Sequence, residues 1–187
     1  MIQNQAGGII ACRFNAWCKS ATASLLCAAL LAAFPAEAAS PAPIKLAIFD
    51  FEFEDFTDRS TGETPSDTEQ LRRVTDEVRQ LLAQSGRYSL IDVGSADAVA
   101  VKAHTLRECN GCDADIALQL RAEQSFVGVV RRISRTEYTV RFQIRDARTS
   151  AVVSSENSGL RMGADYSWSR GAARLIKDRL LESRTQQ

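Results

Sequence analysis

Residues 44–53, IKLAIFDFEF, constrain the fold more than any other stretch of the chain. The first half is apolar on both faces of an extended strand, whereas the second half alternates phenylalanine with acidic residues. A strand that is apolar on both faces has to be covered on both faces. We therefore expect an inner strand whose C-terminal end emerges, with one acidic face, at an edge of the sheet.

A long helix is predicted after this strand. Two overlapping capping patterns precede it, Thr64-Pro65-Ser66-Asp67 and Ser66-Asp67-Thr68-Glu69, and proline is favoured at the first position of a helix. Gly86 ends the helical pattern, because glycine adopts the left-handed conformation that closes many helices. Between these signals, at helical spacing, lie the apolar residues Leu71, Val74, Val78, Leu81 and Leu82.

Short strands and helices alternate in the next part of the chain. We expect a strand at 88–93, a small alanine-rich helix at 95–104, a second helix at 114–123 and a strand at 126–130. Strands that alternate with helices are typical of parallel pairing through right-handed crossovers. The first three strands should therefore run parallel in one sheet.

The pattern changes after residue 130. Residues 138–145 alternate strictly between apolar and polar side chains, which is typical of a half-exposed antiparallel strand. We expect hairpin turns at 132–136 and 146–150 and a further strand at 151–155. This part of the chain should form an antiparallel meander that continues the sheet.

The last predicted element is an amphipathic helix at 166–183, with Asp165 as its expected cap. Its core-facing residues are Trp168, Ala172, Leu175, Ile176 and Leu180. The predicted fold class is thus α/β, a single domain at 44–183 with a mixed sheet. Its order is strand, helix, strand, helix, helix, strand, then the meander and the C-terminal helix.

The first 38 residues have the pattern of a secretion signal. Arg13 and Lys19 precede an apolar run at 21–34, and small residues around Ala38 form a cleavage pattern. The run is shorter than the roughly 20 residues that a membrane-spanning helix needs. We expect cleavage near Ala38, a linker at 39–43, and a periplasmic mature protein without a transmembrane segment. A lipid anchor on Cys27 is an alternative, although Leu26 stands where a lipid-acceptor cysteine needs a small residue.

The composition excludes several classes of function. The chain has 23 Lys and Arg residues and 23 Asp and Glu residues, a net charge of zero, which gives no field that would attract nucleic acid. One histidine is present, and the nucleophile, zinc-protease and phosphate-loop patterns are absent from the sequence. We therefore expect no cofactor, and the sequence identifies no catalytic residue.

Three stretches carry a resemblance to known proteins: IKLAIFDFEFED, LLAQSGRYSLIDV and FVGVVRRISRTEYTVRFQIRDARTSAVV. With the cysteine pair between them, they resemble a family of short secreted proteobacterial proteins of unknown function. In outline the chain is also similar to the amino-terminal domain of TolB and to the curli-secretion (CsgG-like) domain. The resemblance covers residues 44–181, with Ser150 in place of a usual glycine. It implies an α/β fold and an envelope location, and no catalytic residue.

Cys109 and Cys112 form a C-x-x-C motif within ECNGCDAD and are the only cysteines after the predicted signal. In an oxidising envelope they are expected to form a disulfide that fixes the start of the next helix, with Gly111 in an unusual backbone conformation. A redox pair at a helix start is a second interpretation, which the acidic neighbours oppose by repelling a thiolate. Half of a zinc site, completed by His104, is a third.

Carboxylates gather at the end of the first strand. We expect Asp50, Glu52 and Glu54 on one face, with Asp55 and Asp58 in the loop that follows. Hard cations such as calcium are bound by clusters of oxygen ligands, so a cation site is one interpretation. Charged residues also protect a free strand edge from pairing, so a solvated edge is the other.

Arginines gather on the predicted hairpin, at Arg131, Arg132, Arg135, Arg141 and Arg145. Alternation places Arg141 and Arg145 on one face, where they could meet an acidic partner or a phosphate. The alternative is a solvated sheet face with cross-strand pairs to residues such as Glu137 and Glu156.

These observations favour an exported, non-catalytic envelope protein that binds another envelope protein or serves as its accessory factor. Nucleic acid is not an expected partner. The alternatives are a thiol-redox or metal-binding protein that uses Cys109 and Cys112, and a cation-binding protein that uses the acidic strand end.

Overall fold

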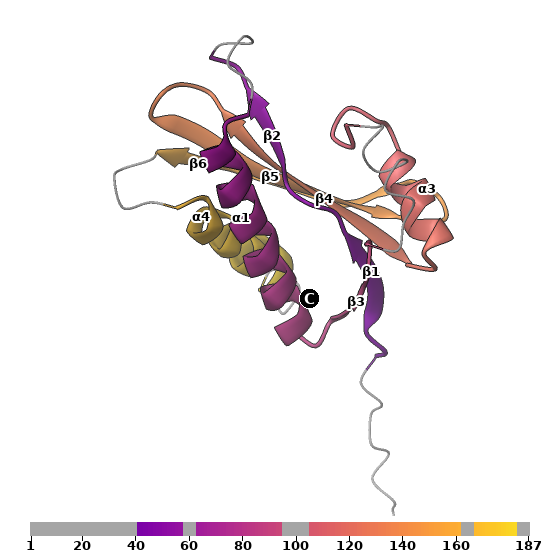
Figure 1. Cartoon of the computed structure of the whole chain (residues 1–187). Coiled ribbons are helices and arrows are strands. Elements are labelled where there is room, and N and C mark those ends of the chain that lie inside the picture. The colour runs from indigo at the N-terminus through magenta and orange to yellow at the C-terminus, as the bar shows by residue number, and fades with distance from the viewer. Residues whose placement is uncertain (1–40, 58–62, 95–104, 162–166, 183–187) are drawn as a thin grey trace, which may run out of the picture. The chain divides into compact units, whose positions relative to one another are not determined.

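A mixed sheet with helices on both faces forms the domain (Figure 1). The structure, a computed structural model, describes residues 41–57, 63–94, 105–161 and 167–182, all within the unit 40–187. Among these residues the strand order is β3-β1-β4-β5-β6, and β2 pairs with β4 on the same side as β1. The predicted fold class, a single α/β domain with a mixed sheet, is confirmed.

The strands of the first half run parallel, as predicted. β1 (Ile44–Ile48) lies between β3 (Tyr88–Ile91) and β4 (Gln124–Arg132) and is parallel to both. The central position of β1 explains its apolar character, because helices cover both faces of the sheet there. The predicted helix at 95–104 lies outside the described residues.

The predicted first strand is broken in two, which corrects the expectation of one continuous strand. β1 and β2 (Glu52–Asp55) both pair with β4. Leu46 lies opposite Gln124, whereas Glu52 lies opposite Val129. From Leu46 to Glu52 the chain therefore has one residue more than β4 has from Gln124 to Val129. The hydrogen bonding to β4 is interrupted where this extra residue lies.

The extra residue changes which face the following side chains occupy. Phe49 packs in the hydrophobic cluster beside α3, whereas Phe51 packs in the cluster beside α1. The expectation that these phenylalanines share one face of the strand is therefore wrong. Side chains of α1 satisfy backbone groups at the break. The N–H of Phe51 donates to Oγ1 of Thr75 at 2.9 Å, and the carbonyl of Ile48 accepts from Nη2 of Arg79 at 3.0 Å.

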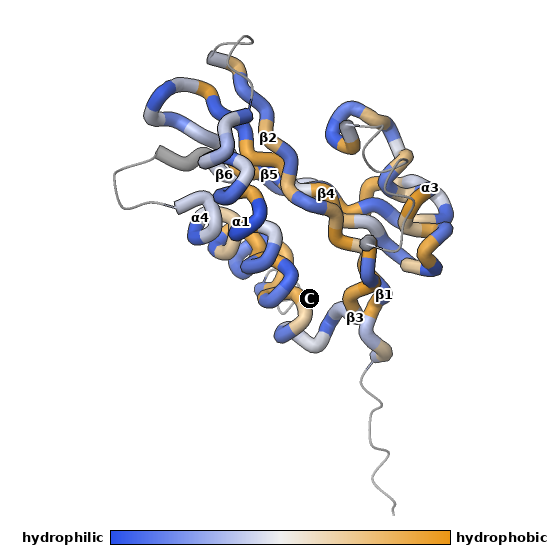
Figure 2. The backbone as a smooth tube through the Cα atoms, in the orientation of Figure 1, coloured by the Kyte–Doolittle hydropathy of each residue, from blue (hydrophilic) through white to orange (hydrophobic). Residues whose placement is uncertain are grey.

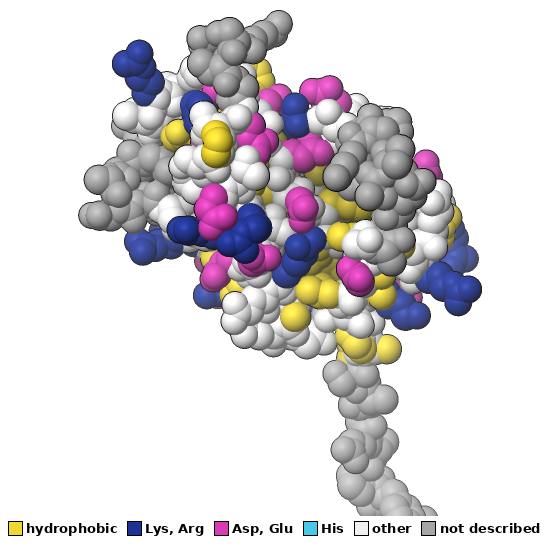
Figure 3. Space-filling model, viewed as in Figure 1, with side chains coloured by type: hydrophobic (Ala, Val, Ile, Leu, Met, Phe, Trp, Pro, Cys, Tyr) yellow, Lys and Arg dark blue, Asp and Glu magenta, His cyan; other side chains and the backbone are white. Residues whose placement is uncertain are grey.

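α1 (Pro65–Gln84) begins at the first of the two predicted capping patterns. The N–H of Asp67 donates to Oγ1 of Thr64 at 3.2 Å, and the N–H of Thr64 donates to Oδ2 of Asp67 at 3.1 Å. Gly86 follows the helix with a φ of 68°, as expected for a residue that closes a helix. The face on the sheet buries Leu71, Val74, Val78 and Leu82, and the outer face carries neighbouring basic and acidic side chains (Figure 3).

α3 (Cys112–Gln119) covers the opposite face of the sheet and is shorter than the predicted helix at 114–123. Arg121 has a φ of 59°, and the N–H of Ala122 donates to the carbonyl of Ala117 at 2.9 Å. This turn directs the chain into β4. The residues after Gln119 that were predicted to be helical therefore form a turn instead.

The antiparallel part consists of β5 (Glu137–Asp146) and β6 (Val152–Arg161), which follow β4 in a meander, as predicted. β6 is longer than the predicted strand at 151–155. The alternation of β5 places Val140, Phe142 and Ile144 in the cluster beside α1. Hydrophobic residues recur along the inner strands of the sheet (Figure 2).

α4 (Trp168–Leu175) continues into a π-helical turn, η1 (Ile176–Leu181). Its cap is Ser167, whose Oγ accepts the N–H of Arg170 at 3.2 Å; the predicted cap, Asp165, lies outside the described residues. The predicted core residues of this helix are confirmed as buried: Trp168, Ala172, Leu175, Ile176 and Leu180.

Candidate functional site

The carboxylates of β2 bind arginines of β4. Glu54 Oε2 lies 2.8 Å from Arg131 Nε, and Asp55 Oδ2 lies 2.8 Å from Arg132 Nη1. In the parallel register Glu54 is opposite Arg131 and Asp55 is opposite Arg132. Successive residues of a strand face opposite sides, so one pair lies on each face of the sheet and both hold β2 against β4.

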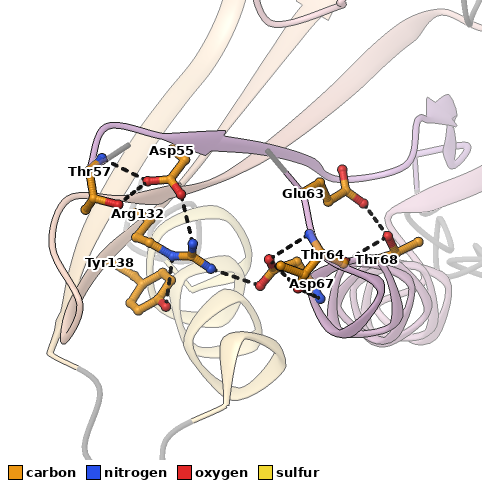
Figure 4. A network of polar contacts seen from close by, with 8 residues as sticks. All are labelled: Asp55, Thr57, Glu63, Thr64, Asp67, Thr68, Arg132 and Tyr138. Carbon is orange, nitrogen blue, oxygen red and sulfur yellow. Dashed lines mark hydrogen bonds and ion pairs between the residues drawn. The ribbon is translucent and has the colours of Figure 1, made fainter. Parts of the chain in front are cut away.

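Arg132 is the centre of a network on the α1 side (Figure 4). Besides Asp55, its guanidinium binds Oδ1 of Asp67 at 3.1 Å and the hydroxyl of Tyr138 at 3.2 Å. It also lies 4.8 Å from the ring centre of Phe53, a cation–π distance. Because Asp67 belongs to the capping box of α1, Arg132 joins the start of that helix to three strands.

The pKa of Asp55 reflects this environment. Burial alone would raise the pKa of this carboxyl. Hydrogen bonds from the hydroxyl and N–H of Thr57 and the positive charge of Arg132 outweigh burial and hold the pKa below its ordinary value. Asp55 therefore stays ionised at neutral pH as the anion of a structural pair.

The other two described residues of the predicted acidic cluster, Glu52 and Asp50, lie apart from each other. Glu52 accepts the N–H of Leu106 at 2.6 Å and binds Arg107 through that residue's N–H and Nη1, both at 3.1 Å. Asp50 is exposed and pairs with Arg79 of α1 at 3.1 Å. The expectation that Asp50, Glu52 and Glu54 share one face is wrong, because the extra residue between β1 and β2 reverses the alternation.

No group of three or more His, Cys, Asp and Glu residues in the described part of the chain could hold a metal ion. Asp58, the fifth residue of the predicted acidic cluster, lies outside the described residues, and so does His104. Each of the four described residues of the predicted acidic cluster thus pairs with an arginine.

Arg145, on β5, binds residues of the cysteine motif and its surroundings. Its Nη1 donates to the carbonyl of Ser150 at 2.8 Å, and its Nη2 donates to Oδ1 of Asn110 at 3.0 Å. Its Nε lies 3.7 Å from Oδ1 of the buried Asp113, whose Oδ2 accepts the hydroxyl of Ser125 at 2.5 Å. This side chain therefore fixes the start of α3 on β4 and β5.

Cys109 and Cys112 face each other, with Cα atoms 5.8 Å apart, in the range that a disulfide spans. The N–H of Cys112 donates to the sulfur of Cys109 at 3.3 Å. Gly111 has a φ of 113°, which confirms the unusual backbone conformation predicted for it. The motif lies at the start of α3, as expected, and the oxidised state of the pair stays a prediction.

The remaining arginines of the hairpin differ in environment. Arg135 is exposed in the turn between β4 and β5, whereas Arg141 is half-buried on the same side of the sheet as Arg145, as alternation predicted. The suggested pair with Glu156 does not form, because Glu156 lies opposite Phe142 and so on the other face. The other three arginines of the hairpin, Arg131, Arg132 and Arg145, bind acids from β2, α1 and α3 instead.

Two residues of these networks, Asp67 and Asp113, are not predicted from the sequence to bind arginines. Both are buried, and each binds an arginine that lies far along the chain. The sequence predicts Asp67 only as a capping residue and places Asp113 only beside the cysteines. Only their burial marks them as partners of arginines, and that burial depends on how the strands and helices pack together.

The described residues thus define a mixed α/β domain in which the buried carboxylates Asp67 and Asp113 each pair with an arginine. Residues 44–180 match the family DUF3280, described as "Protein of unknown function (DUF2380)", and the chain belongs to this family. The predicted membership of a family of unknown function is confirmed. No curated protein matches the chain.

Several solved structures are similar to the chain at low identity. The LpoB C-terminal domain from Salmonella enterica is 14% identical, with a TM-score of 0.46 over 67% of this chain and 87% of that one. The hypothetical protein CT253 from Chlamydia trachomatis is 16% identical, with a TM-score of 0.48 over 78% and 96%. TolB from Acinetobacter baumannii is 16% identical, with a TM-score of 0.44 over 77% of this chain and 29% of that one.

No helix in the described part of the chain is both long enough and apolar enough to cross a bilayer.

Proposed function

We propose that this chain is an exported, non-catalytic envelope protein that binds another protein and acts as its accessory factor. In this proposal residues 1–38 are a signal peptide that is removed near Ala38, and the domain at 44–183 works in the periplasm. The support from the sequence is the short apolar run followed by a small-residue cleavage pattern.

The observation that carries the protein-binding proposal is the free edge of the sheet at β6. This strand spans ten residues, and β5 is its only partner among the described strands. Val152 and Val153 are 47% and 40% exposed at its start. A long edge strand leaves a row of backbone donors and acceptors unpaired, and partner proteins use such edges by adding a strand.

The same proposal gives Cys109 and Cys112 a structural role. A disulfide between them would close the turn before α3, which Arg145 already holds through Asn110 and Asp113. The support is the geometry of the pair and the acidic surroundings of the motif, which do not favour a reactive thiolate.

The test is capture of a binding partner with the mature protein from periplasmic extract of the native host, compared by mass spectrometry between variants. Val153→Lys places a charge on the β6 edge, and charge on an edge strand opposes strand addition. Leu118→Lys is the matched control, because Leu118 is 47% exposed on α3. We expect one protein to be enriched by the wild type and by Leu118→Lys and lost with Val153→Lys. Enrichment of no protein by the wild type would count against the function itself.

A further inference from the structure

Arg141 lies on the same face of the sheet as α3. It is on β5, opposite Val129 of β4 and Asn157 of β6. α3 meets this face through Asp113, which contacts Ser125 and Arg145. Arg141 lies four residues before Arg145 on β5, about 13 Å away in an extended strand. We call the group formed by Arg131, Thr139, Arg141, Gln143 and Asn157, which share this side of the sheet, the Arg141 surface.

The guanidinium of Arg141 has no partner among the described residues. Its Nε is buried and makes no hydrogen bond there. A buried donor without an acceptor costs about 1–3 kcal/mol, and more when it is charged, so such groups in folded proteins usually have a partner. Four other arginines near the sheet each bind a carboxylate: Arg107, Arg131, Arg132 and Arg145.

The carboxylates nearest to Arg141 in the sheet are occupied. Glu52 binds Leu106 and Arg107 with both of its oxygens. Glu54 binds Arg131 at 2.8 Å. Glu156 faces the other side of the sheet. An anion that pairs with Arg141 therefore has to come from outside the described residues.

We propose that the Arg141 surface binds an acidic segment of a protein partner, with one carboxylate of that segment paired to the guanidinium of Arg141. This inference rests on the proposed function and names the chemistry of the partner. Arginine and carboxylate form charge-assisted hydrogen bonds in a planar, paired geometry. Arginine is also among the residues that most often dominate the energy of protein interfaces.

Two further observations define the partner's chemistry. Glu52 and Glu54 lie on the same side of the sheet as Arg141, and their charges oppose a polyanion more strongly than a single carboxylate. Phe56 is 57% exposed, and its ring centre lies 4.8 Å from the guanidinium carbon of Arg131. This ring offers an apolar contact beside the Arg141 surface, so the expected segment carries an acidic residue near an apolar one.

The first step of the test locates the partner on the surface. The photocrosslinking residue p-benzoylphenylalanine replaces Asn157, which is exposed and opposite Arg141, in the full-length protein expressed in its native host. Gln80, exposed on α1, is the control position. We expect a crosslink to one protein from position 157 and none to that protein from position 80, with Asp or Glu in the crosslinked peptide.

The second step measures the contribution of Arg141 to binding. A synthetic copy of the crosslinked peptide is titrated by calorimetry against the mature protein and its variants. Arg141→Glu should weaken binding at least about 30-fold, the effect expected of an interface residue that dominates binding. Arg135→Glu makes the same charge change in the exposed turn and should leave affinity within about twofold. Arg141→Met serves if Arg141→Glu does not fold, as judged by circular dichroism.

The outcomes separate this inference from the proposed function. Three outcomes would overturn the inference and leave protein binding intact. They are crosslinks from position 80 alone, a crosslinked peptide without an acidic residue, and an affinity that is the same for the wild type, Arg141→Glu and Arg141→Met. No crosslink from either position, together with no partner captured by the wild type, would overturn both. A peptide with Lys in place of the acidic residue should bind Arg141→Glu better than the wild type.

Discussion

Removing Arg132 should destabilise the domain far more than removing an exposed arginine with equally short ion pairs. Arg132→Met keeps an extended apolar side chain and deletes the charge that Asp55 and Asp67 share. The side chains of these two carboxylates are only 7% and 6% exposed, so the substitution leaves two buried anions without their cation. Breaking a buried ion pair by removing one partner costs about 3–5 kcal/mol.

We expect a loss near the lower end, about 3 kcal/mol, because both carboxylates keep other hydrogen bonds. Asp55 still accepts the N–H and hydroxyl of Thr57, at 2.8 and 2.7 Å. Asp67 still accepts the N–H and hydroxyl of Thr64, at 3.1 and 2.8 Å. With a urea m-value of about 1–3 kcal/mol/M, the unfolding midpoint should fall by about 1–3 M.

The assay is urea unfolding of the mature protein followed by circular dichroism. Arg72→Met is the matched control, because Arg72 lies 3.0 Å from both Glu69 and Asp76 but its side chain is 62% exposed. Exposed pairs contribute little to stability, so this variant should keep the wild-type midpoint. Asp55→Asn combined with Arg132→Met should cost less than the sum of the two single changes. Equal midpoints for Arg132→Met and Arg72→Met would refute the network as a source of stability.

Three further predictions concern packing, the cysteines and pH. A methyl group on Gly128 would overlap the ring of Phe51, so Gly128→Ala should lower the free energy of unfolding by about 1–3 kcal/mol. Adding Phe51→Leu should recover part of that loss in the same urea titration, and no recovery would contradict the contact. Replacing Cys109 and Cys112 by serine should cost about 2 kcal/mol, the entropy of a four-residue loop, and a reductant should destabilise the wild type only. Asp55 has a lowered folded-state pKa, so its stabilisation is present above its unfolded pKa of about 4 and is lost as pH falls further. The difference in stability between wild type and Asp55→Asn should therefore shrink below about pH 4, and a difference that grew there would have the wrong sign.

Local signals were sufficient to predict α1. Its cap, the proline at its first position and the spacing of its apolar residues lie within the helix or next to it. The antiparallel meander was likewise predicted from the alternation in 138–145. Each of these features depends on residues that are close together in the sequence, which is why a single sequence contains them.

The break between β1 and β2 could not be predicted in this way. The extra residue is defined only against β4, and its backbone groups are bound by Thr75 and Arg79, which lie 24 and 31 residues further along the chain than their partners. The arginine–carboxylate pairs span even more of the chain, 77 residues for Glu54 and Arg131. One signal was available: parallel pairing of the first strand with β4 brings an acidic strand end beside an arginine pair.

The break between β1 and β2 also decides which charges remain free for a partner. Without the extra residue, Asp50, Glu52 and Glu54 would share one face. With it, Glu52 and Glu54 come to the α3 side, where Arg107 and Arg131 bind them, and Asp55 reaches Arg132 on the other side. The acids at this strand end therefore serve to attach β2 and the segment at 105–107 to the sheet. Arg141 is left half-buried without a carboxylate among the described residues, which is why we place recognition there and not at the acidic strand end.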